Sequence, residues 1–268
     1  MRSSSGTYGW FWQLGQQVRL AVEALGYAGL LLLESFYWLL MGWRQEQRVH
    51  PAAVAAEMVQ AGVRAIPIVA MLAFTVGLML AIQLMATLSE FGAQSQAVLA
   101  IAISVTREFG PLITGIVVAG RTASALAARI GSMMVSQEVD ALRVIGIAPV
   151  RYLATPPLVA LLVMMPVLTV IADTVAILGG GLYSAPRLQL ALPAYLQQSL
   201  QVLEVSDVAQ GLLKSVVFGL LIALVGVASG FTVRGGAEGV GRATTRAVVM
   251  AISALVVADM FFTWLLNR

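Results

Sequence analysis

The chain has 268 residues, of which 59% are hydrophobic and only 11% are charged. Soluble globular domains carry about 25% charged residues, so a chain this apolar cannot cover its hydrophobic side chains with polar ones. The net charge of +3 comes from basic residues scattered singly between apolar runs, without the basic stripe of a nucleic-acid-binding protein. Composition and charge therefore exclude a soluble domain and a nucleic-acid partner, and they predict an all-α integral membrane protein.

The first 50 residues are predicted to form interfacial or elbow helices, apart from a transmembrane domain expected at 51–268. Residues 24–43 are long enough to span a bilayer, but four of the five tryptophans lie between residues 10 and 43, and Trp prefers the membrane–water interface. Glu34 lies within this segment, where a lipid-facing span tolerates a carboxylate poorly. We favour helices that lie in the interface or enter it partway, with a true span as the alternative.

Five apolar segments follow, and each meets or exceeds the ~20 residues that a helix needs to cross a bilayer. They cover residues 63–88, 96–120, 152–183, 208–233 and 244–266. The third contains Pro156, Pro157 and Pro166, which remove backbone donors and favour a tilted or kinked helix. Residues 185–207 are expected to form an outer loop with an amphipathic portion.

The basic residues predict the orientation, because cytoplasmic loops are enriched in Lys and Arg. With five spans and a cytoplasmic N-terminus, 12 of the 16 basic residues fall on the cytoplasmic side. Only Arg187 and Arg268 then fall outside, while Arg107 and Lys214 lie within spans. This orientation places the C-terminus on the outer side of the membrane.

Charged residues inside the spans are the strongest candidates for a functional site, since a charge at the bilayer centre costs on the order of 3 kcal/mol. Glu108 and Lys214, the only lysine, are predicted to line a polar cavity that contacts a charged headgroup. The alternatives are a structural ion pair, or a lysine that snorkels to the outer interface. Arg107 lies about 100° from Glu108 on an α-helix, so the two are expected to face different directions. Asp173 and Asp259 are weaker candidates.

Small residues predict where helices pack closely. A stripe with four-residue spacing consists of Gly115, Ala119, Ala123, Ala127 and Gly131, and a shorter stripe consists of Gly226 and Gly230. This spacing keeps the small residues on one helix face, where another backbone can approach. Both stripes are packing signals and indicate no chemistry.

Residues 132–149, between the second and third spans, predict a short cytoplasmic amphipathic helix. Its apolar residues at helical spacing are Val135, Val139, Leu142 and Ile145, and its polar surface comes from Gln137, Glu138, Asp140 and Arg143. Gly146 suits a helix C-terminus and Pro149 prevents continuation. The helix is either an interfacial connector or a docking helix for a cytoplasmic partner.

Signatures of catalysis are absent from the sequence. A P-loop has the pattern G-x-x-x-x-G-K-[ST], whereas leucines precede Lys214 in GLLKS, so this lysine does not belong to a P-loop. Neither H-E-x-x-H nor G-x-S-x-G occurs in the sequence. The single histidine, His50, cannot form a His-based metal site, and the lack of cysteine excludes thiolate ligands. We therefore expect no catalytic residue, no metal site and no enzymatic activity in this chain.

Several motifs resemble those of MlaE/YrbE-type permeases of ATP-binding cassette (ABC) transporters. Residues 106–157 contain R-E-x-G-P and A-G-R-x-x-S-A in register, and GLLKSVVFG (211–219) and GRATTRAVV (241–249) follow. The resemblance implies a homodimer in the inner membrane of a Gram-negative bacterium, with a periplasmic C-terminus. It also implies three partners, namely an ABC ATPase that binds ATP and Mg, a STAS-domain protein and a periplasmic ring of MCE-domain proteins.

The same resemblance implies a function, which is to move phospholipid between the inner and outer membranes and so maintain outer-membrane lipid asymmetry. By analogy, Glu108, Lys214 and Arg107 would line a lipid cavity. A coupling helix at 132–146 would contact the ATPase through Val135, Gln137, Glu138, Val139, Asp140, Leu142 and Arg143. Two alternatives remain: an ion- or proton-coupled secondary transporter that uses Glu108, Asp173 and Asp259, and a non-transporting anchor for the MCE ring.

Overall fold

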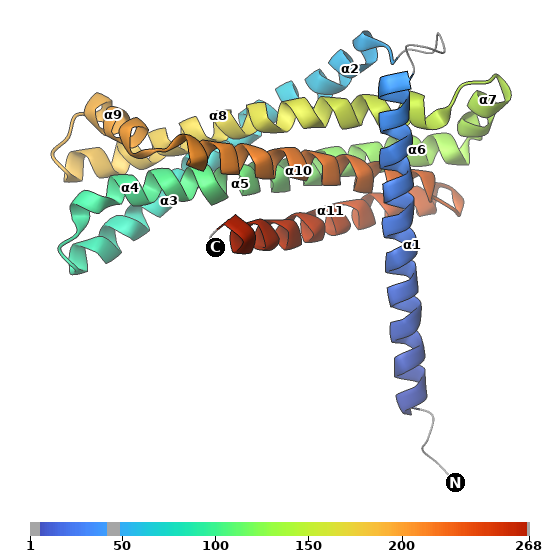
Figure 1. The fold of residues 1–268 in the computed structure, drawn as a ribbon, viewed down its shortest axis with the longest axis horizontal. Helices are drawn as coiled ribbons and strands as arrows, with labels where there is room; N and C mark the ends of the chain where they lie inside the picture. The colour runs from blue at the N-terminus through green and yellow to red at the C-terminus, as the bar shows by residue number, and fades with distance from the viewer. Residues whose placement is uncertain (1–5, 42–48, 267–268) are drawn as a thin grey trace.

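The computed structural model describes residues 6–41 and 49–266, and all the regular elements in these ranges are helices (Figure 1). The α-helices are α1 (Gly6–Met41), α2 (Pro51–Glu57), α3 (Ile66–Glu90), α4 (Ala97–Ser104), α5 (Gly110–Val118), α6 (Ser124–Val135), α7 (Glu138–Val144), α8 (Thr155–Arg187), α9 (Leu192–Val202), α10 (Val205–Phe231) and α11 (Gly236–Leu266). Between them lie the π-helical turns η1 (Met58–Gly62), η4 (Val105–Phe109), η5 (Ala119–Ala123) and η6 (Val150–Ala154), and the 3₁₀ turns η2 (Val63–Ala65) and η3 (Gln94–Gln96).

Among the described residues, five continuous helical segments are long and apolar enough to cross a membrane, which confirms the all-α integral membrane fold. These spans are Pro51–Glu90, Gln94–Val135, Val150–Arg187, Val205–Phe231 and Gly236–Leu266. The first begins well before residue 63 and the second ends well after residue 120, because the helical backbone continues beyond the apolar stretch into segments that carry charged residues. Apolar periodicity therefore located the spans but not their ends.

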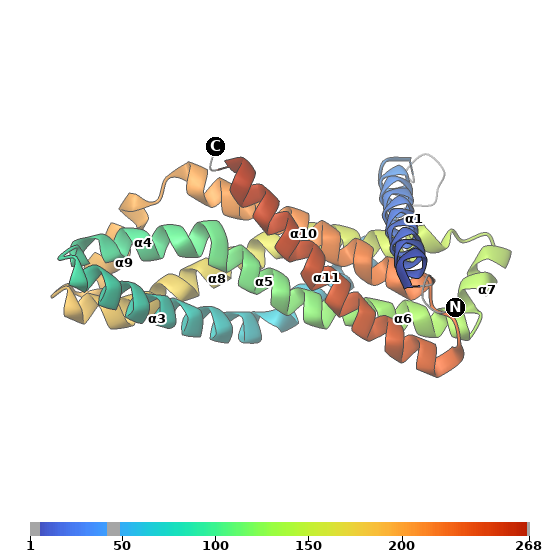
Figure 2. The ribbon, with the colours of Figure 1, turned by 90° about the horizontal axis from the view of Figure 1, so that it is seen from below.

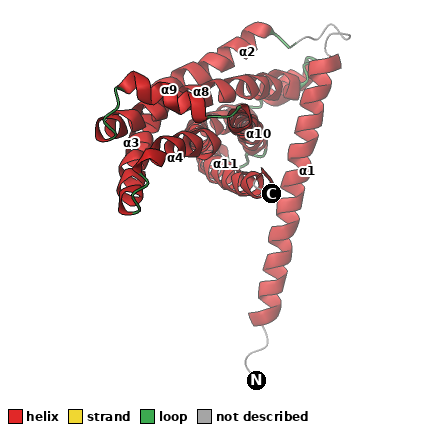
Figure 3. Ribbon diagram, turned by 60° about the vertical axis from the view of Figure 1, so that its left-hand side comes forward, coloured by secondary structure: helices red, strands yellow, loops and turns green. Residues whose placement is uncertain are grey.

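Helices α8 and α10 occupy the centre of the bundle. Helix α8 packs against α3 and α10 (Figure 3). Helix α10 also packs against α6 and α11. Helices α3 and α8 approach so closely that a Cβ on Gly77 would collide with the Ala176 carbonyl, while one on Gly179 would lie 2.5 Å from the carbonyl oxygen of Phe74. Such backbone contact is a main source of helix association in lipid.

The predicted small-residue stripe packs span 2 against α10. A Cβ on Gly226 would lie 3.1 Å from the Cα of Ala123, and one on Gly230 would lie 3.4 Å from the Cα of Ala127. In Figure 2, α4, α5 and α6 follow one another along the bundle, and α11 runs obliquely across α5 and α6. This packing confirms the prediction and holds span 2 in a fixed register beside α10.

The N-terminal region differs from the expected group of helices, because a single helix, α1, covers residues 6–41. It crosses the long axis of the bundle steeply (Figures 1 and 2). Leu31 and Ser35 are buried, and the Trp38 ring lies 5.7 Å from the Arg151 guanidinium carbon. Its apolar part, Gly26–Met41, is shorter than the five spans. An interfacial position of α1 stays a prediction.

Candidate functional site: a charged cluster inside the bundle

Arg107 and Glu108 of the R-E-x-G-P motif lie on a π-helical turn, η4, which interrupts span 2, and Gly110 and Pro111 begin α5. Pro111 has no backbone N–H and its ring would clash with the carbonyl of residue 107 in a regular α-helix, so a wider turn is favoured here. At Gly110 a Cβ would collide with the Asp173 carboxylate on α8, which explains the glycine. Irregular π-turns are frequent at functional sites, and this one carries Arg107 and Glu108.

Lys214 on α10 lies at the centre of a charged cluster. Its ammonium donates to Glu108 Oε2 at 2.6 Å and to Thr263 Oγ1 at 3.1 Å, and it forms an ion pair with Asp259 Oδ1 at 3.0 Å. The Thr263 hydroxyl in turn donates to Glu108 Oε1 at 3.1 Å. The lysine side chain is only 1% exposed, so it does not snorkel to the interface, and its charge is compensated by two carboxylates and a hydroxyl.

Arg107 pairs with a different carboxylate, that of Asp207 in the first turn of α10. The Arg107 Nε donates to Asp207 Oδ1 at 2.6 Å, and its Nη2 contacts the same oxygen. Asp207 Oδ2 also accepts the backbone N–H of Glu204 at 2.9 Å, as part of a capping box. Asp207 therefore fixes the start of α10 and the position of Arg107 together.

A cavity of about 330 Å³ opens beside the cluster. Six of its lining residues carry polar groups: Ser104, Arg107, Glu108, Gln210, Lys214 and Thr263. The side chains of Arg107 and Glu108 are 33% and 34% exposed, so a cation and a carboxylate are the charged groups that reach the opening. The opening of this cavity carries one charge of each sign, and apolar helices surround it. Such a cavity can hold the polar headgroup of an amphipathic ligand while the apolar part of that ligand stays in lipid.

The structure brings the three predicted cavity residues together and adds partners that the sequence did not assign. Arg107 and Glu108 line the same cavity, contrary to the expectation that they face different ways, although they pair with different residues. Asp259 joins the cluster, whereas Asp173 lies against Gly110, outside the group that lines the cavity. The spacing of polar residues along α10 and α11 could have indicated these additional partners. Asp207, Gln210 and Lys214 recur along one face of α10, and Asp259 and Thr263 are one turn apart on α11.

The predicted amphipathic segment is divided into two helices. Val135 ends α6, Gln137 adopts a left-handed φ of 62°, and the separate helix α7 covers Glu138–Val144. Gly146 has a φ of 82° and closes α7 as expected, with the Ile147 N–H donating to the Leu142 carbonyl at 2.9 Å. The left-handed turn at Gln137 reverses the chain, which a count of apolar spacing does not reveal.

The two apolar sides of α7 have different surroundings. Val139 is buried and Leu142 packs against the bundle core, while Val144 and Ile145 are 87% and 67% exposed. Asp140 and Arg143 form a surface ion pair at 2.9 Å. The exposed surface of this region is therefore the C-terminal end of α7 with its charged residues, and Val139 and Leu142 hold α7 against the bundle.

Comparison with known proteins identifies the family. Residues 54–265 match the family described as Permease MlaE. A probable ABC transporter permease protein of Rickettsia typhi is 38% identical over 207 residues, which cover 77% of this chain and 80% of that protein. The chloroplastic protein trigalactosyldiacylglycerol 1 of Arabidopsis thaliana is 32% identical, covering 79% of this chain and 61% of that protein. The intermembrane phospholipid transport system permease protein MlaE of Haemophilus influenzae is 29% identical, covering 93% of this chain and 94% of that protein. This chain therefore belongs to the MlaE family of ABC transporter permeases.

Proposed function

We propose that this permease moves phospholipid between the inner and outer membranes of a Gram-negative bacterium and so maintains outer-membrane lipid asymmetry. The observation that carries the proposal is the Glu108–Lys214–Asp259 cluster beside a cavity within the transmembrane bundle. A phospholipid needs an apolar path for its tails and a few polar groups for its headgroup. The name of the Haemophilus influenzae relative, an intermembrane phospholipid transport system permease, supports the same substrate.

The arrangement of charges suggests how a headgroup is held. Both Lys214 and Arg107 line the cavity, but the Lys214 side chain is only 1% exposed and that of Arg107 is 33% exposed. Asp207 binds Nε and Nη2 of Arg107, so a phosphate would use the remaining guanidinium N–H groups, and we assign the first phosphate contact to Arg107 rather than to Lys214. Glu108 at the same opening suits the ammonium of a zwitterionic headgroup. Lys214 then holds Glu108 in place. A phosphate reaches Lys214 only when the lysine separates from its carboxylate partners.

Energy for transport is proposed to come from a separate ABC ATPase that binds ATP and Mg and contacts α7. Val144 and Ile145 offer exposed apolar contacts to such a partner, beside Glu138, Asp140 and Arg143. A STAS-domain protein on the ATPase and a periplasmic ring of MCE-domain proteins complete the proposed assembly. Nucleotide-driven movement of α7 would shift the bundle between two conformations.

A second copy of the chain is the proposed partner for α11. Only a narrow face of this span is buried, and Val256, Val257 and Met260 are 51–68% exposed. Because α11 also carries Asp259 and Thr263, a homodimer through this helix would place the two cavities next to each other. The distribution of basic residues favours an orientation in which the C-terminus lies on the periplasmic side of the inner membrane.

Phospholipid transfer from proteoliposomes that contain the complete complex tests the proposal. The Lys214→Ala and Glu108→Ala variants should assemble with the ATPase but lose most ATP-dependent transfer. A matched control is Arg64→Gln, which removes an exposed charge elsewhere. Full transfer by both cavity variants would favour a non-transporting anchor, and transfer that continues without the ATPase would favour a secondary transporter.

A further inference from the structure

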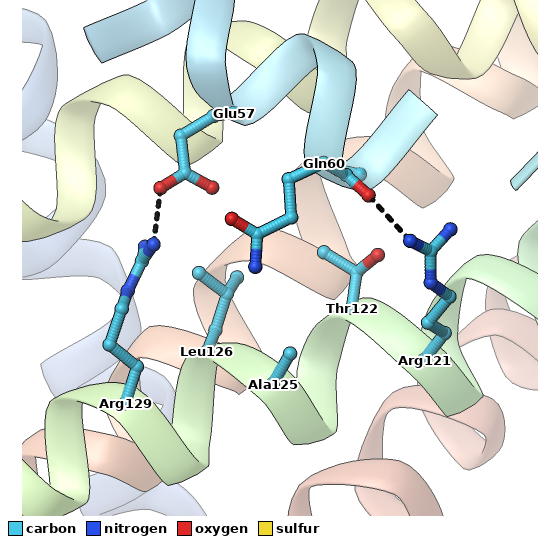
Figure 4. Close-up of a pocket in the computed structure, with 8 residues that line it drawn as sticks. Glu57, Gln60, Arg121, Thr122, Ala125, Leu126 and Arg129 are labelled. Atoms are coloured by element: carbon cyan, nitrogen blue, oxygen red, sulfur yellow. Dashed lines mark hydrogen bonds and ion pairs between the residues drawn. The ribbon is translucent and has the colours of Figure 1, made fainter. Parts of the chain in front are cut away.

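A second cavity lies between the beginning of span 1 and the end of span 2, and it contains the arginine of the A-G-R-x-x-S-A motif (Figure 4). Its volume is about 50 Å³, and the lining residues that matter here are Glu57, Gln60, Arg121, Ala125, Leu126 and Arg129. At 1.5 Å per residue, Arg121 is about 20 Å along span 2 from Glu108. The cavity is therefore separate from the charged cluster, toward the end of the bundle that carries α7.

Two arginines flank this cavity, and each has one fixed contact. Arg129 Nη1 pairs with Glu57 Oε1 at 2.6 Å, and Arg121 Nη2 donates to the carbonyl oxygen of Gln60 at 2.9 Å. Figure 4 shows the two guanidinium groups on opposite sides, with the Gln60 side chain between them. These contacts join the start of span 1, where Glu57 ends α2 and Gln60 lies on η1, to the end of span 2, where Arg121 lies on η5 and Arg129 on α6.

Each arginine also has a buried N–H without an acceptor among the described residues. The atoms are Nη1 of Arg121 and Nε of Arg129. A buried donor on a charged group is unfavourable unless an acceptor occupies the space next to it. Because the two arginines face a single carboxylate, that of Glu57, the lining carries a net positive charge and favours an anion.

The cavity has room for more than a single water molecule. Its volume of about 50 Å³ exceeds the ~10–15 Å³ that one water requires. Guanidinium groups match the oxygens of phosphate in geometry and charge. Val59 and Val63, on either side of Gln60 in the chain, are each 48% exposed, so the part of span 1 that carries Gln60 also presents apolar side chains on the outside of the bundle.

We propose that this cavity binds the phosphate group of a membrane phospholipid, as a second lipid site toward the α7 end of the bundle. The adjacent exposed valines favour a ligand with acyl chains over a free phosphate ion, which would use the same two arginines. The site shares no residue with the Glu108–Lys214 cavity. It consequently does not depend on the transport function proposed above.

Lipid titration of the delipidated full-length chain, followed by native mass spectrometry, tests the proposal. The probe is dioleoyl phosphatidylglycerol, and the variants are the double substitution Arg121→Gln/Arg129→Gln and the single substitution Ala125→Phe. Ala125→Phe adds a large side chain to the cavity lining without removing a polar group, and a melting curve for each variant separates loss of the site from loss of the fold. Arg64→Gln is the matched control, because Arg64 is exposed and outside the lining.

The wild type and Arg64→Gln should bind one phospholipid that both cavity variants bind about ten-fold more weakly or worse. The double substitution removes charge-assisted hydrogen bonds, and Ala125→Phe occupies the space of the phosphate. Lys214→Ala should keep this lipid, even where it abolishes transfer. Equal occupancy in the wild type and both cavity variants would overturn the proposal and leave a hydrated cavity. Orthophosphate that binds in place of the lipid, and resists displacement by it, would overturn the lipid assignment.

Discussion

Lys214 donates a hydrogen bond to Glu108 across 2.6 Å, although 106 positions separate the two residues in the chain. The contact joins span 2 to α10, and Asp259 adds α11 to the same group. Three helices thus meet at one buried ammonium. Removing either partner of such a pair leaves an uncompensated charge, which costs more than the pair itself contributes. The cluster is consequently both a structural junction and the polar wall of the cavity.

Replacing Lys214 by Met should destabilise the protein by about 1–3 kcal/mol, because Glu108 and Asp259 lose their shared cation. Thermal unfolding in detergent measures the effect. The double variant Lys214→Met/Glu108→Gln should recover part of this loss, since it removes one of the unpaired carboxylates. If the double variant recovers stability but not lipid transfer, the cluster has a role beyond folding. Unchanged stability of Lys214→Met would contradict the ion-pair assignment.

Asp207→Asn should lower the stability by about 1 kcal/mol, the usual contribution of a helix cap, and should also weaken lipid transfer. Both effects follow from one carboxylate that caps α10 and binds Arg107. Ser206→Ala provides the control, because within the described ranges the hydrogen bond of its hydroxyl goes to the neighbouring Glu204 side chain. Chemical denaturation and the transfer assay together measure the outcome. A variant with normal transfer would show that Arg107 needs no fixed position.

Gly211→Ala should disturb the cavity from its far side. The added Cβ would collide with the Thr106 carbonyl oxygen in η4, so α10 must move away from the π-turn that carries Arg107 and Glu108. We expect a loss of several degrees in the thermal midpoint and reduced transfer. Gly241→Ala is the comparison, since a Cβ there meets nothing within 4 Å and alanine favours the helix. Equal behaviour of the two variants would be inconsistent with the packing described.

Different residues of α7 should have separable effects on ATPase binding. Val144→Asp and Ile145→Asp change exposed side chains and should abolish capture of the ATPase while the permease stays folded. Leu142→Asp should instead destabilise the permease, because Leu142 packs against the bundle. Co-purification, together with a melting curve for each variant, distinguishes the two effects. Retention of the ATPase by both exposed-site variants would remove α7 as the coupling element.

The sequence predicted the features that depend on local composition. Runs of apolar residues located the five spans, and four-residue spacing predicted the close contact between span 2 and α10. Glu108 and Lys214 were recognisable because a charge within an apolar run is expensive. Asp207 could not be recognised in the same way, because it lies at the start of α10 in a stretch that resembled an outer loop. Its pairing with Arg107 depends on tertiary structure.

Backbone irregularities account for the other differences. The π-turn at 105–109 is not visible in an apolar pattern, so Arg107 and Glu108 were expected to diverge on a regular α-helix. The left-handed residue Gln137 similarly divides a segment whose spacing suggested one helix. In both places the local conformation changes the direction of side chains that periodicity had assigned to a single face.

Photo-crosslinking inside the cavity tests the central claim most directly. A photoreactive residue at Gln210, which lines the cavity, should capture phospholipid in the assembled complex, and the yield should fall when ATP is hydrolysed or when Lys214 is replaced by Ala. The same probe at Val163, an exposed position on α8, should capture lipid regardless of ATP or Lys214. If the yields at Gln210 and Val163 respond identically, the charged cavity is not the path that the lipid takes.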